Sequence, residues 1–345
     1  MRDAALSSPA LAAPHAPAAR APLPAVQWLA VLFFSAALLF AGVAWFSGDV
    51  FFLRLATEAL ILGGLALSVD VLLGGTGLLP LGQALFFGLG AYVSALVLKH
   101  WAASFWLAMA VVLAASALAG LVGGLIAIRS RGVYFALISF GLAQVVSKVV
   151  FNTRELGASD GIIGVPNVDI VPGLATGSPL GFFLLTLVFI GCIYLALAYL
   201  METPFGRQLA AIRTNEHRVP FLGFNPRHYK LAAFVLAACI AGASGALYPM
   251  LRGFVSPELM FFQVSGNAVI NVIVGGTGTL LGPLYGSALL TGLRSVVGSY
   301  TAHHQIVIGL LFIVVVIVLP RGLVGYAAPA LDRWLARAKD RGGRS

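Results

Sequence analysis

Long apolar runs constrain the fold of this chain more than any other feature. A transmembrane helix needs about 20 mostly apolar residues, and a helix in lipid satisfies its own backbone hydrogen bonds. With only 10% charged residues in a chain of 345, too little polar surface would remain to coat a soluble core. The clear runs lie near 27–46, 53–73, 78–98, 105–128, 132–150, 181–201, 231–251 and 304–320. We therefore expect an all-α fold, a polytopic bundle of transmembrane helices.

Basic residues lie between these runs and in the terminal segments, and this pattern accounts for the net charge of +9 without a nucleic-acid partner. Loops rich in Lys and Arg stay on the cytoplasmic side of a membrane. The rule places the link 129–131 and the loop 202–230 in the cytoplasm, together with both termini. We expect a disordered cytoplasmic tail over 1–26, rich in Ala and Pro, a transmembrane domain over 27–320 and a basic cytoplasmic tail over 321–345.

The stretch 259–299 is ambiguous when it is judged by length and hydropathy alone. Because both termini are expected on the same side, the number of crossings must be even. Two short spans near 260–275 and 280–298, joined by the glycine-rich link Gly275–Gly278, meet this requirement. The sequence therefore predicts about ten spans.

A second glycine cluster, Gly74–Gly77, interrupts the apolar sequence. Such interruptions are typical of the broken or re-entrant helices that surround transporter binding sites. Asp70 lies just before the cluster and either lines a substrate path or anchors the end of its span. In the same span, Glu58 can pair with Arg54 one helical turn away. The predicted substrate-path residues are Asp70, Gly75, Gln83, Tyr134 and Gly276.

The sequence contains no recognisable source of chemical energy. All six histidines fall in tails, loops or span ends, so no row of proton-carrying side chains crosses the bilayer. The sequence also lacks a P-loop, a Ser-His-Asp arrangement and metal-ligand spacing. We expect no catalytic residues, no metal site and no bound cofactor, so uphill transport would need energy from a partner.

The loop 202–230 is too long to be a simple turn. Its middle, 206–222, carries apolar residues such as Leu209 and Ile212 at helical spacing beside charged ones, and Pro220 and Gly223 end it. We expect a short amphipathic helix on the cytoplasmic face. Such a helix either docks a partner or rests on the membrane surface.

Within this loop the sequence TPFGRQLAAIRTNE, residues 203–216, resembles the cytoplasmic coupling segment of LivM-type permeases. These are the membrane subunits of ABC importers for branched-chain amino acids. The chain departs from the family at Asp70, where Asn is common, and at 80–83, which reads Pro-Leu-Gly-Gln where Ser-Leu-Gly-His is usual. The likeness covers about 55–325, with matches in order at 77–79, 86–92, 131–136, 222–225, 229–234, 241–248, 255–258 and 274–283.

This resemblance implies a multi-pass permease subunit in the inner membrane of a bacterium. It implies four partners: a second homologous permease subunit, two cytoplasmic ABC ATPase subunits and a periplasmic solute-binding protein, with membrane lipids around them. ATP and Mg²⁺ would be used by the ATPase subunits and not by this chain. The coupling residues that the matched segment implies are Gly206, Arg207, Ala211, Arg213, Asn215, Glu216 and Gly223.

Two alternatives to a branched-chain amino acid permease remain open at this point. Urea and short-chain amide permeases share most of the same landmarks. A stand-alone secondary transporter or channel belongs to a different class, and it would move solute without ATP or partners. An integral membrane enzyme acting on lipids is a third class, but it would need clustered His, Asp or Glu near one membrane face.

Overall fold

Helices make up nearly all of the computed structural model, which describes residues 23–101, 104–171, 174–175, 177–300 and 304–342. The α-helices are α1 (Leu23–Phe46), α2 (Val50–Thr76), α3 (Gln83–Leu96), α4 (Phe105–Ala127), α5 (Val133–Asn152), α6 (Pro179–Glu202), α7 (Pro204–Asn215), α8 (Pro226–Arg252), α9 (Phe262–Gly275), α10 (Gly282–Tyr300), α11 (His304–Val318) and α12 (Gly322–Gly342). A π-helical turn, η1 (Val97–Trp101), continues α3, and three 3-10 turns lie in links: η2 (Arg154–Leu156), η3 (Val219–Leu222) and η4 (Pro257–Met260).

The predicted all-α bundle is confirmed. Within the described ranges, eight helical segments are long and apolar enough to cross a membrane. The ambiguous stretch 259–299 folds as predicted into two short helices, α9 of 14 residues and α10 of 19. Every run predicted as a span is therefore helical, although the boundaries differ in places.

Two of these boundaries differ for identifiable reasons. Helix α3 begins at Gln83, five residues later than predicted, because α2 ends at a left-handed Gly77 and Pro80 lies in the non-helical link that follows. The cluster Gly74–Gly77 is thus the C-terminal turn of α2. Helix α1 begins at Leu23, so 23–26 are helical where a disordered tail was predicted, and the rest of that tail lies outside the described residues.

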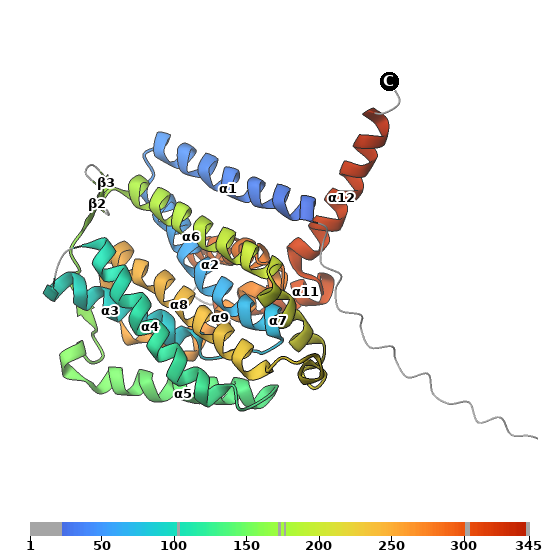
Figure 1. The fold of residues 1–345 in the computed structure, drawn as a ribbon. Helices are drawn as coiled ribbons and strands as arrows, with labels where there is room; N and C mark the ends of the chain where they lie inside the picture. Colours follow the sequence, from blue (N-terminus) through green and yellow to red (C-terminus); the bar gives the residue numbers. More distant parts are fainter. Residues whose placement is uncertain (1–22, 102–103, 172–173, 176, 301–303, 343–345) are drawn as a thin grey trace, which may run out of the picture.

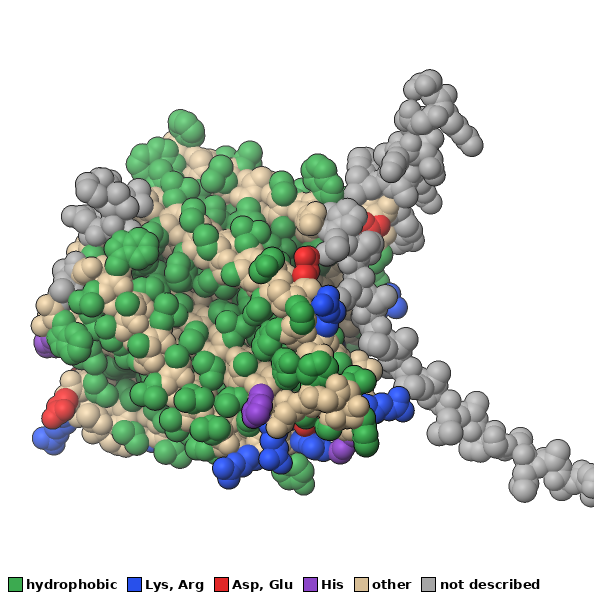
Figure 2. Space-filling model, in the orientation of Figure 1, with side chains coloured by type: hydrophobic (Ala, Val, Ile, Leu, Met, Phe, Trp, Pro, Cys, Tyr) green, Lys and Arg blue, Asp and Glu red, His purple; other side chains and the backbone are tan. Residues whose placement is uncertain are grey.

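Helices α2, α3 and α8 pack together at the centre of the bundle, with α4, α6 and α10 around them (Figure 1). Small residues bring their backbones together, as they do in lipid-embedded helices. A Cβ atom on Gly90 of α3 would overlap the backbone of Gly242 in α8. Figure 2 shows hydrophobic side chains over most of one face of the molecule, with Lys and Arg mainly along its margins.

The two ends of the bundle carry different segments. At one end, strand β1 (Ile162–Ile163) pairs with β4 (Phe254–Val255), which ties the link before α6 to the link after α8. The short strands β2 (Asp169–Val171) and β3 (Leu174–Ala175) form a second antiparallel pair beside α6. Helix α7 lies at the other end, together with the start of α12 (Figure 1). We refer to these as the strand end and the α7 end.

The three basic segments predicted to share one side gather at the α7 end. Arg131, in the link between α4 and α5, makes an ion pair with Glu216 just after α7. The backbone of Arg321, just before α12, lies beside Gly276 in the turn between α9 and α10. This agreement supports the predicted crossings, while the membrane side of this end remains a prediction.

Candidate coupling site at the α7 end

Helix α7 begins sharply and buries one face. Pro204 occupies the first helical position, where its missing N–H costs nothing. Leu209 and Ile212 are buried one turn apart, and Gly206 packs so closely on the backbone of Met201 in α6 that a Cβ atom would overlap it. The amphipathic helix is therefore confirmed, with its apolar face on the bundle.

The predicted extent of this helix is too long. A single helix was expected over 206–222, but α7 ends at Asn215 and the chain resumes as the 3-10 turn η3 (Val219–Leu222). Pro220 explains the break, because it donates no hydrogen bond and restricts the residue before it. Gly223 then ends η3 in the left-handed conformation, as its predicted stop role requires.

Arg213 connects α7 to the end of α2. Its Nη1 donates a hydrogen bond of 2.6 Å to the backbone carbonyl of Gly74. The last carbonyls of a helix lack partners within it and carry partial negative charge, so a guanidinium group is favourable there. The same nitrogen lies against Gly278 of the turn between α9 and α10. The side chain thus contacts two other elements of its own chain.

Asp70 holds the turn between α9 and α10. Its carboxylate is buried, and it accepts hydrogen bonds from the backbone N–H of Gly278 at 2.7 Å and of Leu280 at 3.1 Å. Both of these residues have positive φ, 78° and 58°, a conformation that is costly for Leu. We call Asp70, Gly74, Arg213 and Gly278 the junction. The two backbone hydrogen bonds explain how the Asp70 carboxylate can be buried. The role of Asp70 on the substrate path stays a prediction.

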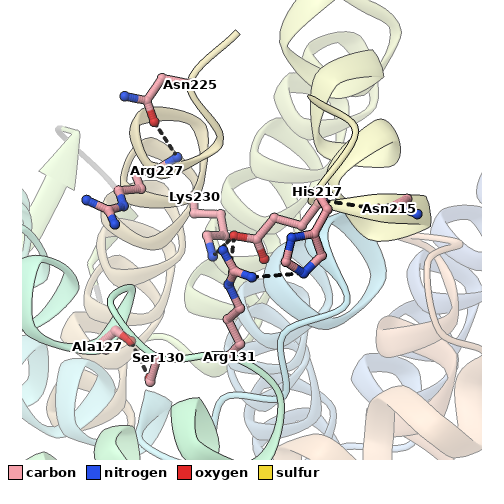
Figure 3. A network of polar contacts seen from close by, with 9 residues as sticks. Ala127, Ser130, Arg131, Asn215, His217, Asn225, Arg227 and Lys230 are labelled. Atoms are coloured by element: carbon pink, nitrogen blue, oxygen red, sulfur yellow. Dashed lines mark hydrogen bonds and ion pairs between the residues drawn. The ribbon is translucent and has the colours of Figure 1, made fainter. Parts of the chain in front are cut away.

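A polar network beside α7 includes Arg131, His217 and Lys230 (Figure 3), and Glu216 is at its centre. Glu216 accepts a hydrogen bond of 2.8 Å from Nζ of Lys230, whose side chain is only 1% exposed. Nε of Arg131 lies 3.5 Å from the same oxygen, and Nη1 of Arg131 lies 3.0 Å from Nε2 of His217. The network joins the α4–α5 link, the end of α7 and the start of α8.

The predicted coupling residues therefore fall into two groups. Arg213 and Glu216 bond to other elements of the chain, whereas Arg207 and Asn215 are exposed and bond only to residues near them in the sequence. Ala211 is half-buried. The structure also exposes apolar side chains that the sequence reasoning missed. Phe221 is 89% exposed and Leu222 is 64% exposed, both in η3. No periodic pattern marked them, because they lie in a turn after the helix.

The predicted path residues are not brought together at one place. Gly75 lies against Leu209 of α7, and Gly276 ends α9 with φ of 122°. Gln83 is buried at the start of α3, and neither its Oε1 nor its Nε2 has a hydrogen-bond partner among the described residues. Tyr134 is 73% exposed at the start of α5. Their role in transport stays a prediction.

Comparison with known sequences finds related proteins over most of the chain. The profile of the family described as "Branched-chain amino acid transport system / permease component" matches residues 51–316. The high-affinity branched-chain amino acid transport system permease protein LivM of Escherichia coli strain K12 is 29% identical over 322 residues, covering 86% of this chain and 76% of that protein. The protein of the same name from Salmonella typhimurium is 29% identical over 330 residues, covering 89% and 78%.

A more distant relative carries a different solute in its name. The ribose import permease protein RbsC of Haemophilus influenzae is 23% identical over 227 residues, covering 61% of this chain and 67% of that protein. No solved structure matches the chain significantly. The similarity thus rests on sequence, and it includes α2 to α10 and most of α11.

Proposed function

The chain belongs to the family of branched-chain amino acid transport system permease components, and from this membership we propose that it is the membrane-spanning subunit of an ATP-driven importer. Its solutes are branched-chain or related hydrophobic amino acids, as the names of the LivM relatives suggest. The chain is a transport component and not an enzyme. ATP with Mg²⁺ is used by separate ATPase subunits.

The observation that carries this proposal is the two-sided construction of the segment from α7 to η3. One side is bound to the bundle through Leu209, Arg213 and Glu216. The other side presents Phe221 and Leu222 of η3 to the outside, and Arg207 of α7 is also exposed. An exposed aromatic surrounded by polar groups is typical of a residue that fills a pocket on a partner.

A segment that contacts the bundle on one side and a partner on the other can transmit a movement of the ATPase to the transmembrane helices. A nucleotide can shift the permease between two access states only if the ATPase contacts those states differently. Because α7 is joined to α2 and to the α9–α10 turn through the junction, a displaced α7 changes the positions of three spans. We assign α7 and η3 as the ATPase-docking segment on the cytoplasmic side of the inner membrane.

The remaining partners follow from the same proposal. A periplasmic binding protein delivers the solute at the strand end, and a second homologous permease completes the passage. Reconstitution of all these subunits in liposomes tests the proposal. We expect uptake of leucine that requires both ATP and the loaded binding protein. Flux from this chain alone, without ATP or partners, would show a stand-alone transporter or channel, and uptake of urea but not leucine would show the wrong solute class.

Phe221 tests the docking assignment directly. Burying a Phe side chain contributes about 1.5–3 kcal/mol, so Phe221→Ala should weaken binding of the ATPase subunit by about 10- to 100-fold. The affinity can be measured by titrating the ATPase onto the permease in nanodiscs. Phe51→Ala is a matched control, because Phe51 is 60% exposed at the other end of α2 and should not change this affinity. An unchanged affinity for Phe221→Ala would contradict the docking role.

A further inference from the structure

A cavity of about 160 Å³ lies between α2, α8, α9 and α10. Its lining runs from Tyr248, near the strand end of α8, to Asn271 and Leu290, near the middle of their helices, and includes none of the junction residues. A water molecule needs only about 10–15 Å³ of such space, so the cavity has room for a small ligand. Glu58, 20% exposed, lies on its wall, and Asn271, 5% exposed, lies on its buried side.

The charges around this cavity favour an anionic group. Arg54 was a candidate partner for Glu58 in the sequence, but Glu58 pairs with Arg252 at the end of α8, at 2.6 Å. Arg294 of α10 donates to the amide oxygen of Asn267 at 2.5 Å, and among the described residues no carboxylate lies within ion-pair distance of it. Of the two charged residues that line the cavity, Glu58 is thus neutralised by Arg252 from outside the cavity, and Arg294 contributes a positive charge without a counter-ion. Arg294 is partly buried, and a cation without a counter-ion in a span is rarely retained without a functional partner.

Asn271 presents an acceptor that has no partner. Its Oδ1 is fully buried and makes no hydrogen bond within the described part of the chain. Asn267 and Asn271 are one turn apart on α9, so both amides line the same face of the cavity. Buried polar groups are nearly always hydrogen-bonded. The free oxygen therefore points to a ligand that donates hydrogen bonds.

The rest of the lining is apolar. Leu62 and Leu65 of α2 and Leu290 of α10 contribute aliphatic surface beside the polar groups. A few placed polar groups in an apolar pocket are typical of small-molecule sites, where the polar groups fix orientation. The cavity thus combines a cation, a hydrogen-bond acceptor and aliphatic walls within one small volume.

We propose that this cavity is a solute site that holds an amino acid with an apolar side chain during its passage. Arg294 binds the carboxylate, Oδ1 of Asn271 accepts from the ammonium group, and the three leucines contact the side chain. The negative charge of Glu58 favours the ammonium group on the same wall. The inference rests on the proposed function and adds to it the place and the chemistry of recognition in the membrane subunit.

The test uses the complete reconstituted importer with saturating binding protein, and it measures leucine taken up per ATP hydrolysed. Arg294→Gln removes the charge while keeping a hydrogen-bond donor, and it should lower this ratio by about tenfold or more. ATP hydrolysis and complex assembly should stay near their original values. Arg294→Lys restores the charge and should recover most of the uptake.

A second variant keeps the test decisive if Arg294→Gln does not assemble. Asn271→Leu keeps the Arg294–Asn267 contact and the side-chain volume, and it should also lower the ratio. Arg54→Gln is the control, because Arg54 is an exposed arginine of α2 outside this cavity. An assembled Arg294→Gln or Asn271→Leu importer with the original ratio would overturn the inference. Failure of the unaltered complex to take up leucine would instead overturn the proposed function.

Discussion

The buried ion pair between Lys230 and Glu216 gives the most quantitative prediction for the α7 end. Replacing Glu216 by Gln leaves the ammonium group of Lys230, 1% exposed, without a counter-charge. Removing one partner of a buried ion pair costs about 3–5 kcal/mol. Glu216 is itself 18% exposed, so we expect the lower end of this range, a loss of about 3 kcal/mol in the free energy of unfolding. The carboxylate also contacts Arg131, but that guanidinium is 58% exposed, and the pair contributes less than about 1 kcal/mol.

A double-variant cycle separates the ion pair from other effects of each substitution. We expect Glu216→Gln and Lys230→Met to destabilise the chain separately, and the double variant to be less destabilised than the sum, because no uncompensated charge is left. The free energies can be measured by equilibrium unfolding in mixed detergent micelles. Arg131→Gln serves as a control and should change stability by less than about 1 kcal/mol. If both single variants lie within about 0.5 kcal/mol of the original chain, the buried ammonium group of Lys230 does not depend on Glu216 for its stability.

Two further predictions concern the turn between α9 and α10 and the packing of these helices. Asp70→Ala removes the acceptor for two part-buried backbone N–H groups and should cost about 2–4 kcal/mol of unfolding free energy. Asp70→Asn keeps one oxygen and should cost about half as much, and equal losses in thermal unfolding assays would contradict the turn-holding role. Gly286→Ala places a methyl group against the backbone of Asn271 and should cost about 1–3 kcal/mol. Gly292→Ala, on the same helix with open space around it, should be near neutral, and a similar loss for both glycine variants would refute the close-packing argument.

The spans could be predicted from the sequence because the length of an apolar run is fixed by the thickness of the bilayer, a local property. The glycine-rich link within the stretch 259–299 and the gathering of the basic segments at one end could also be predicted, because the positive-inside rule requires an even number of crossings. The partner of Glu58 could not be predicted in this way. Arg54 was the obvious choice on one helix, but Arg252 is 194 residues away in the sequence and only the packing of α8 on α2 brings it close.

The candidate site was predicted in outline and not in detail. Helical spacing identified the buried face of α7, with Leu209 on it, but it does not say where a long side chain goes. Arg213 reaches back to the end of α2, so its interactions depend on where that helix ends. Phe221 was missed because a single exposed aromatic after a proline break carries no periodic signal. The bounds of the predicted domains, and the membrane side of each end, stay predictions.

Helix α2 joins the two places where this chain is proposed to act. Near its last turn, Asp70 and Gly74 belong to the junction beside α7, and near its first turns Glu58 and Leu62 line the cavity. Glu58 and Gly74 are 16 residues apart on α2, a separation of about 24 Å along the helix. If α2 tilts as a rigid body by about 5° about its position at Gly74, Glu58 moves by about 2 Å. A displacement of α7 would therefore change the shape of the cavity through α2. In the same way, a solute bound in the cavity would oppose or favour the tilt of α2 and so the displacement of α7.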